Sequence, residues 1–188
     1  MQRTIPLSVP LLNVLFANRT ALQKSFLILA GVFVLAFASQ LSIPLQPVPL
    51  TFQSATVILI GMAYGARYGT YVVSLYLLAG FCGAPVLADF SSGPAHFAGP
   101  TAGYLFGFLG AAWVSGWLAS LGFGRHIFSA FMAALIGAII IFAAGVTVLA
   151  SFMGIKSALT FGLMPFVISE PIKLFAVSAI IPRLWKQS

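Results

Sequence analysis

Charged residues are scarce in this sequence of 188 amino acids. They make up 6% of the chain, whereas hydrophobic residues make up 61%, and a soluble domain carries about a quarter charged residues. Such a chain cannot cover itself with polar groups, so its solvent must be lipid. The net charge of +7 does not indicate a nucleic-acid-binding surface, because the basic residues are mostly scattered singly between apolar runs. Only two residues are acidic, Asp89 and Glu170.

The residues and motifs that many enzymes need are also missing. The chain has one cysteine, Cys82, and two histidines, His96 and His126, which excludes an internal disulfide and gives no metal-ligand spacing. It contains no GxxxxGK[ST] loop for nucleotide hydrolysis and no HExxH or GxSxG hydrolase motif. We therefore predict a protein that is not an enzyme, with no cofactor and no metal.

Long apolar segments are what the sequence has in abundance. A membrane-spanning helix needs about 20 largely apolar residues. Six segments are candidates: 22–41, 52–66, 68–83, 102–121, 127–150 and 163–184. We predict an all-α membrane domain of six transmembrane helices over residues 22–188. The second and third segments are short, and the GARYG sequence between them predicts a tight turn.

The first 21 residues differ from the rest. Pro6 and Pro10 interrupt them, and the apolar stretch LLNVLFA is too short to span a bilayer. We predict that residues 1–21 form a cytoplasmic or interfacial segment rather than a signal peptide.

The basic residues predict the orientation of the six helices. If the N-terminus is cytoplasmic, all but two of the nine Lys and Arg residues lie on the cytoplasmic side. These are Arg3, Arg19, Lys24, Arg67, Arg125, Arg183 and Lys186. Of the other two, Lys156 lies outside and Lys173 lies within the sixth helix. Because basic residues favour the cytoplasmic side, we predict that both termini face the cytoplasm.

Two outward connections are rich in proline and glycine and still keep apolar residues. They are SIPLQPVPLT (42–51) and APVLADFSSGPAHFAGPT (84–101). Proline and glycine at this density prevent regular helix. A fully solvated loop does not need apolar residues, so we predict that both loops fold back as lids over the outer end of the bundle. The third connection, 151–159, is short.

Small residues recur every four positions in the fourth and fifth segments. One stripe is Gly103, Gly107, Ala111, Ser115 and Ala119, and a second is Ala112, Gly116 and Ser120. Such stripes let helix backbones approach closely in lipid. We expect packing within one bundle, in preference to a surface for another protein.

Glu170 and Lys173 lie in the middle of an apolar segment, PFVISEPIKLFAVSAI. An ionised side chain in hydrocarbon costs about 2.5–3.5 kcal/mol on insertion scales. The two residues are three apart, so on a helix they share a face and can offset each other's charge. With a helix that starts near Pro165, the pair lies at modest depth beneath the outer loops. This arrangement favours a small-molecule pocket open to the outside.

Two other interpretations of the pair stay open. It could be a salt bridge that holds helices together, or part of a proton or ion relay. A relay needs a chain of ionisable groups through the membrane, and the other segments offer nothing comparable. Asp89, in the second outer loop, could equally be an ordinary turn residue within DFSSG.

Four stretches resemble the BioY family, the biotin-specific substrate-binding components of energy-coupling factor transporters. They are PLQPVPLTFQ (44–53), GAPVLADFSSG (83–93), GPTAGYLFGF (99–108) and PFVISEPIK (165–173). Their order and spacing are specific, although any one alone is weak. The resemblance implies a six-helix protein of a prokaryotic cytoplasmic membrane that binds biotin from outside. It also implies a separate transmembrane coupling subunit and two cytoplasmic ATPase subunits that hydrolyse ATP.

The resemblance also implies which residues bind the ligand. The acid and the lysine of the family fall on Glu170 and Lys173, although the family usually has aspartate at the first position. A polar loop contact falls near Asp89, and Tyr104 is implied to line the pocket. We expect aromatic residues such as Phe52, Phe90 and Phe97 to bury the ring system of biotin.

Three alternatives remain from the sequence. The chain could be a substrate-binding component for another small vitamin-like solute on the same scaffold. It could be a self-sufficient carrier or channel for a small solute. It could also be a structural membrane protein whose ion pair is neutral and binds nothing.

Overall fold

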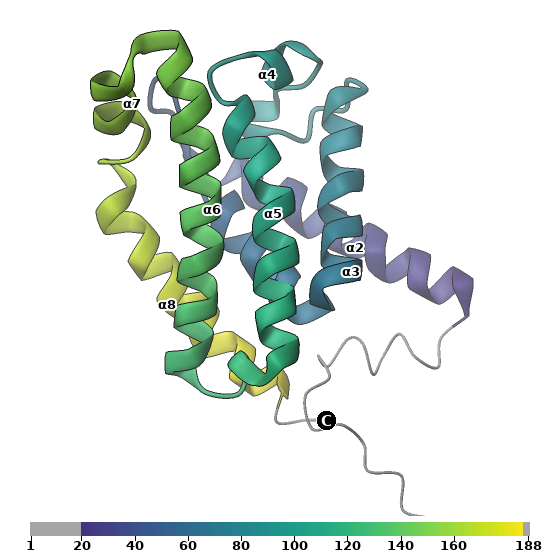
Figure 1. Ribbon diagram of the computed structural model, residues 1–188. Coiled ribbons are helices and arrows are strands. Elements are labelled where there is room, and N and C mark those ends of the chain that lie inside the picture. Colours follow the sequence, from purple (N-terminus) through teal and green to yellow (C-terminus); the bar gives the residue numbers. More distant parts are fainter. Residues whose placement is uncertain (1–19, 186–188) are drawn as a thin grey trace, which may run out of the picture.

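A computed structural model describes residues 20–185, most of which form helices that run side by side (Figure 1). The predicted interfacial segment 1–21 lies almost entirely outside the described residues. The elements are α2 (Ala21–Gln40), β1 (Ser42–Ile43), β2 (Leu50–Thr51), α3 (Gln53–Phe81), η1 (Ala88–Phe90), α4 (Ala95–Ala98), α5 (Ala102–Leu118), η2 (Ala119–Phe123), α6 (Ile127–Met153), α7 (Ile155–Gly162) and α8 (Phe166–Trp185).

Element α3 contains the predicted tight turn. Gly65 has φ 78° and ψ 167°, which is not helical and which glycine adopts without steric cost. A Cβ atom on Gly69 would lie 2.8 Å from the Cα atom of Gly61. Eight residues of straight helix would separate these positions by about 12 Å. The chain therefore doubles back at Gly65, and the predicted segments 52–66 and 68–83 are the two arms of α3.

The apolar helices make the chain a multi-pass membrane protein. Within residues 20–185, three helical stretches are long and apolar enough to cross a membrane: α2, α5 with η2, and α6. The pair α7 and α8, bent by 46°, makes a fourth if it is one broken span. The arms of α3 are shorter than this criterion requires. The six-span, N-in and C-in arrangement therefore stays a prediction.

The small-residue stripes pack inside the bundle, as expected. Gly107 lies against α6, where an added Cβ atom would meet the Cα atom of Ile141 at 2.9 Å. Gly116 lies on the other side of α5 against the turn of α3, where an added Cβ atom would meet the backbone nitrogen of Ala66 at 2.5 Å. Backbones this close leave no room for larger side chains, so α5 packs tightly between α6 and the turn of α3.

The end of the bundle that the basic residues predict to face outward, called the outer end, carries the short elements. Strands β1 and β2 pair antiparallel, Ser42 with Thr51 and Ile43 with Leu50, and so close the proline-rich loop. Elements α4 and α7 lie at the same end of the bundle (Figure 1). One expectation was wrong: the connection at 151–159 is not merely a short link, because residues Ile155–Gly162 form α7.

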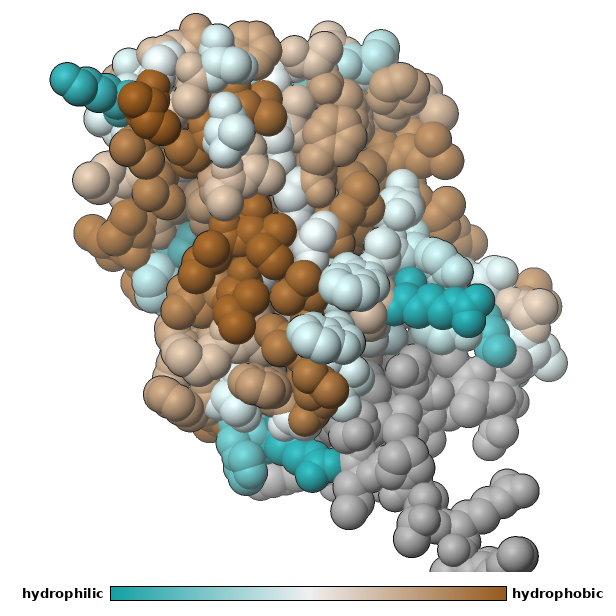
Figure 2. Space-filling model, in the orientation of Figure 1, coloured by the Kyte–Doolittle hydropathy of each residue, from teal (hydrophilic) through white to brown (hydrophobic). Residues whose placement is uncertain are grey.

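The surface matches a lipid solvent. Figure 2 shows a mainly hydrophobic face, with hydrophilic residues in a few small groups. On α2, large apolar side chains point away from the bundle, among them Leu22, Phe26, Phe33 and Phe37. Exposure of this kind is unfavourable in water and neutral in hydrocarbon.

Candidate functional site

A cavity of about 400 Å³ lies beneath the outer loops, within the usual range of about 300–1,000 Å³ for small-molecule sites. Its wall comes from the 46–54 stretch, the 87–101 loop and helices α5, α6 and α8. The lining residues are Gln46, Pro47, Val48, Pro49, Thr51, Gln53, Ser54, Leu87, Ala88, Asp89, Ser91, His96, Pro100, Thr101, Tyr104, Leu105, Phe108, Ile141, Phe142, Phe166 and Glu170. Three of the four predicted site residues, Glu170, Asp89 and Tyr104, are on this wall.

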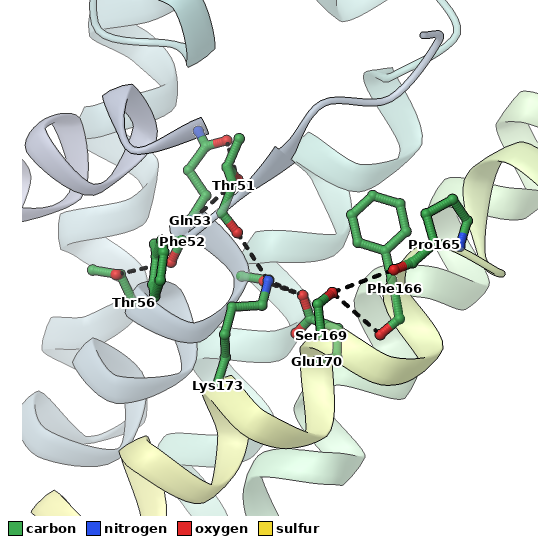
Figure 3. A network of polar contacts seen from close by, with 10 residues as sticks. Thr51, Phe52, Gln53, Thr56, Pro165, Phe166, Ser169, Glu170 and Lys173 are labelled. Carbon is green, nitrogen blue, oxygen red and sulfur yellow. Dashed lines mark hydrogen bonds and ion pairs between the residues drawn. The ribbon is translucent and has the colours of Figure 1, made fainter. Parts of the chain in front are cut away.

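Glu170 is a buried carboxylate on the cavity wall. Helix α8 begins at Phe166, so Glu170 lies in its second turn. Ser54 Oγ, from α3, donates a hydrogen bond of 2.8 Å to Glu170 Oε1, and Lys173 Nζ contacts the same oxygen (Figure 3). The second oxygen, Oε2, is buried and has no hydrogen-bond partner among the described residues. The site therefore holds a strong acceptor that the protein leaves unused.

Lys173 is buried beside Glu170 but is not on the cavity wall. Besides Glu170, its Nζ atom donates to the backbone oxygen of Thr51 at 2.9 Å and to Ser54 Oγ at 3.1 Å (Figure 3). An ammonium has three donors, and three protein acceptors surround this one. Lys173 thus compensates the charge of Glu170 and ties α8 to the start of α3.

Pro171, the residue after Glu170, does not free a carbonyl for the site. Pro171 lies inside α8, which continues through it. Proline removes the donor to the carbonyl four residues earlier, which is that of Val167, an exposed residue away from the cavity. The carbonyl that meets the ammonium belongs to Thr51 in the outer loop instead.

Asp89 lies on the cavity wall in the second outer loop. Its Oδ1 atom accepts a hydrogen bond of 2.6 Å from Ser42 Oγ, so the carboxylate joins the two proline-rich loops. Its backbone is left-handed, with φ 55° and ψ 37°, a conformation that aspartate tolerates better than most residues. Asp89 is therefore both a turn residue, as expected for DFSSG, and a residue of the cavity wall.

Tyr104 lines the cavity from α5. Its hydroxyl donates a hydrogen bond of 2.9 Å to the backbone oxygen of Gly162 at the end of α7. Its ring packs on Gly145 of α6, where a side chain would not fit. The residue therefore joins three helices at the cavity and presents its ring to the interior.

The aromatic residues of the wall are not the ones expected. Phe52, Phe90 and Phe97 are absent from the lining, and the first two are 50% and 69% exposed. The lining phenylalanines come from the helices instead: Phe108, Phe142 and Phe166. The position of Phe108 could have been inferred, since it lies four residues after Tyr104 and shares its helix face.

The polar residues at the start of α3 and just before it were not expected. Thr51, Gln53 and Ser54 are buried and line the cavity. Three polar residues beside the start of an apolar helix could have indicated a polar site there, because a buried polar group needs a hydrogen-bond partner. Among the described residues, no cluster of His, Cys, Asp and Glu could hold a metal ion.

Comparisons of the sequence with known proteins all point to one family. The family model described as "BioY family" matches residues 12–188. The "Biotin transporter BioY" of Thermotoga maritima is 40% identical over 164 residues, which cover 85% of this chain and 95% of that protein. The "Probable biotin transporter BioY" of Pyrococcus horikoshii is 34% identical over 168 residues, which cover 89% of this chain and 96% of that protein.

A solved structure is similar as well. It is the crystal structure of the S-component for biotin from an ECF-type ABC transporter. The two folds superpose with a TM-score of 0.78 at 28% sequence identity, over 90% of this chain and 96% of the other.

Proposed function

Because the chain belongs to the BioY family, we propose that its outer cavity holds biotin, with Glu170 as the main polar contact. The chain is a biotin-binding membrane component of a transport system and not an enzyme. The observation that carries the proposed site is that Glu170 lines the cavity and that its Oε2 atom is buried without a hydrogen-bond partner among the described residues.

The chemistry of biotin suits this acceptor. Its ureido ring has two N–H donors, and a carboxylate oxygen makes a strong, charge-assisted bond to such a donor. A buried acceptor without a partner costs about 1–3 kcal/mol, and a ligand N–H would recover that cost. Ligands that lack a donor at this position are rejected for the same reason.

The rest of the wall suits the remainder of the ligand. Its apolar part includes Val48, Leu87, Leu105, Phe108, Ile141, Phe142 and Phe166, which would enclose the thioether ring. Polar side chains of the outer loops, among them Asp89 and Ser91, lie on the same wall. In this arrangement Lys173 compensates the charge of Glu170 and does not contact the ligand, because protein acceptors already occupy its donors.

The remaining parts of the proposal concern topology and partners. We propose six membrane-spanning segments with both termini in the cytoplasm, in a prokaryotic cytoplasmic membrane. The two arms of α3 would each cross as a short helix, and the basic residues support this orientation. A separate coupling subunit and two ATPases would supply the energy, in keeping with the lack of a P-loop in the sequence.

Isothermal titration of biotin into the detergent-purified, ligand-free chain tests the proposal. We expect binding without nucleotide, because no residue here handles phosphate. Lipoic acid is a useful control, since it has a sulfur-containing ring and a carboxylate tail but no ureido group, and it should not compete. A folded, empty sample that gives no binding heat at micromolar protein would refute the biotin site.

Two further measurements separate the alternative functions. Mass spectrometry of the molecule that co-purifies with the chain would identify a different vitamin if one is bound. Uptake of biotin into liposomes that contain only this chain would indicate a self-sufficient carrier. We expect biotin in the first experiment and no energised uptake in the second.

A further inference from the structure

The side chain of Gln40, at the end of α2, holds one wall of the cavity. Its Nε2 atom donates to the backbone oxygen of Leu87 at 3.0 Å. Its Oε1 atom accepts from the backbone nitrogen of Phe90 at 2.9 Å. A single amide thus provides a hydrogen-bond partner for the backbone at both ends of residues 87–90. Three of these residues, Leu87, Ala88 and Asp89, line the cavity.

Neighbouring residues attach the same segment to the bundle. Ser39 Oγ, also on α2, donates to the backbone oxygen of Val86 at 2.6 Å. The hydroxyl of Tyr76, on α3, donates to that oxygen at 3.0 Å. Ser42 holds the Asp89 carboxylate, as described above. Side chains at the end of α2 are therefore bonded to the backbone of the 86–90 segment at Val86, Leu87 and Phe90.

The segment that Gln40 holds is strained. Asp89 and Phe90 both have φ 55°, in the left-handed region that is unfavourable for an L-residue. Phenylalanine has no local hydrogen bond to offset this cost, and its side chain is 69% exposed, so packing offsets little of it. Strained backbone persists only where surrounding contacts impose it, and the hydrogen bond from Phe90 N–H to Gln40 is such a contact.

We propose that Gln40 is the positioning residue of this wall, and that its amide keeps residues 87–90 closed over the cavity and so slows the departure of the ligand. The second part rests on the proposed function, because it requires a ligand in the cavity. The residue touches no part of the cavity itself. It acts through its two hydrogen bonds to Leu87 and Phe90, the residues on either side of Ala88 and Asp89.

The test is the rate at which labelled biotin leaves the full-length protein carrying Gln40→Met. Methionine keeps the length of the side chain and removes the two hydrogen bonds to the segment, together with the contacts of Nε2 with Ser39 Oγ at 2.8 Å and with the backbone oxygen of Ala36 at 3.3 Å. Leaving the two backbone groups without their partner should raise the dissociation rate about tenfold to a hundredfold. The association rate should change by less than about threefold, since affinity differences within one site lie mostly in dissociation.

The chain offers a matched control in Gln23, the other glutamine of α2. Its side chain accepts from the backbone nitrogen of Thr20 at 3.3 Å in the capping box at the far end of the helix. Gln23→Met removes a hydrogen bond from the same helix without touching the wall, so it should leave the dissociation rate unchanged. An equal increase in both variants would mean that general loss of helix stability is responsible, and would overturn the proposal.

A rescue variant tests the strain directly. Glycine adopts positive φ readily, so adding Phe90→Gly to Gln40→Met should slow dissociation again, by about fivefold. An unchanged dissociation rate in Gln40→Met alone would overturn the positioning role while biotin binding to the unaltered chain upholds the proposed function.

Hydrogen exchange gives a result that does not depend on the ligand. In the ligand-free protein, the amides of residues 87–90 should exchange faster in Gln40→Met than in Gln23→Met. Equal exchange in the two variants would overturn the positioning role. If the unaltered chain binds no biotin, the proposed function fails, and this measurement decides the role of Gln40 independently.

Discussion

Lys173 contacts one of the two carboxylate oxygens of Glu170, and the other oxygen is buried without a partner among the described residues. The ammonium of Lys173 donates its other hydrogen bonds to the backbone oxygen of Thr51 and to Ser54 Oγ. The charge of the pair is thereby compensated inside the protein, while one acceptor of Glu170, a residue that lines the cavity, stays unpaired. A salt bridge that served structure alone would gain from pairing both oxygens, since an unpaired buried acceptor is costly.

Glu170→Gln should weaken biotin binding. The change keeps the shape of the side chain but replaces one acceptor oxygen by an NH2 group, which would face the N–H donors of the ureido ring. Loss of one charge-assisted hydrogen bond costs about 1.5–3 kcal/mol, or about ten- to a hundredfold in affinity. Titration calorimetry measures the effect.

Glu170→Asp is the control for that variant, because it keeps the carboxylate and shortens the side chain by one methylene. It should bind biotin more tightly than Glu170→Gln. The same affinity in the unaltered chain and in Glu170→Gln would show that the carboxylate does not touch the ligand.

Lys173→Met should destabilise the protein strongly. It leaves the Glu170 carboxylate, the Thr51 carbonyl and the Ser54 hydroxyl without their common partner. Breaking a buried ion pair by removing one member costs about 3–5 kcal/mol. Thermal unfolding in detergent should show a lower midpoint, and calorimetry should show weaker biotin binding.

The double variant Glu170→Gln/Lys173→Met separates a binding site from a structural ion pair. It removes both charges, so thermal stability should recover relative to Lys173→Met alone. If Glu170 binds the ligand, affinity stays low in this stable protein. Unchanged affinity there would mean that the pair is structural, and the assignment of the site would fall.

Tyr104→Phe should affect stability more than binding. It removes the hydrogen bond from the tyrosine hydroxyl to the backbone oxygen of Gly162, at a cost of about 1 kcal/mol. The ring stays on the cavity wall, so biotin affinity should change by less than about threefold. Thermal unfolding and calorimetry provide the two values, and a loss of affinity as large as that in Glu170→Gln would indicate direct contact between the hydroxyl and the ligand.

Two single cysteines test the topology, in a Cys82→Ala background. Ser91→Cys places a thiol in the second outer loop, and Arg125→Cys places one between η2 and α6. A membrane-impermeant maleimide added to intact cells should label the first and not the second. Labelling of both from outside would contradict the six-span arrangement.

The sequence determined the features that depend on neighbours along the chain. Hydropathy indicated which segments form membrane helices, since a membrane span depends only on consecutive apolar residues. Gly65 marked the turn between the arms of α3. The contact between Glu170 and Lys173 followed from their spacing of three on one helix. Resemblance added Asp89 and Tyr104, both of which lie on the cavity wall.

The tertiary structure decided what depends on residues far apart in sequence. Ser54 and Glu170 are separated by 116 positions, and Gln40 and Phe90 by 50, so no local pattern pairs them. Packing likewise selected Phe108, Phe142 and Phe166 for the cavity and left Phe52 and Phe90 exposed. The physical reason is that hydropathy fixes which segments are helical, whereas the crossing of helices at their small residues fixes which side chains meet.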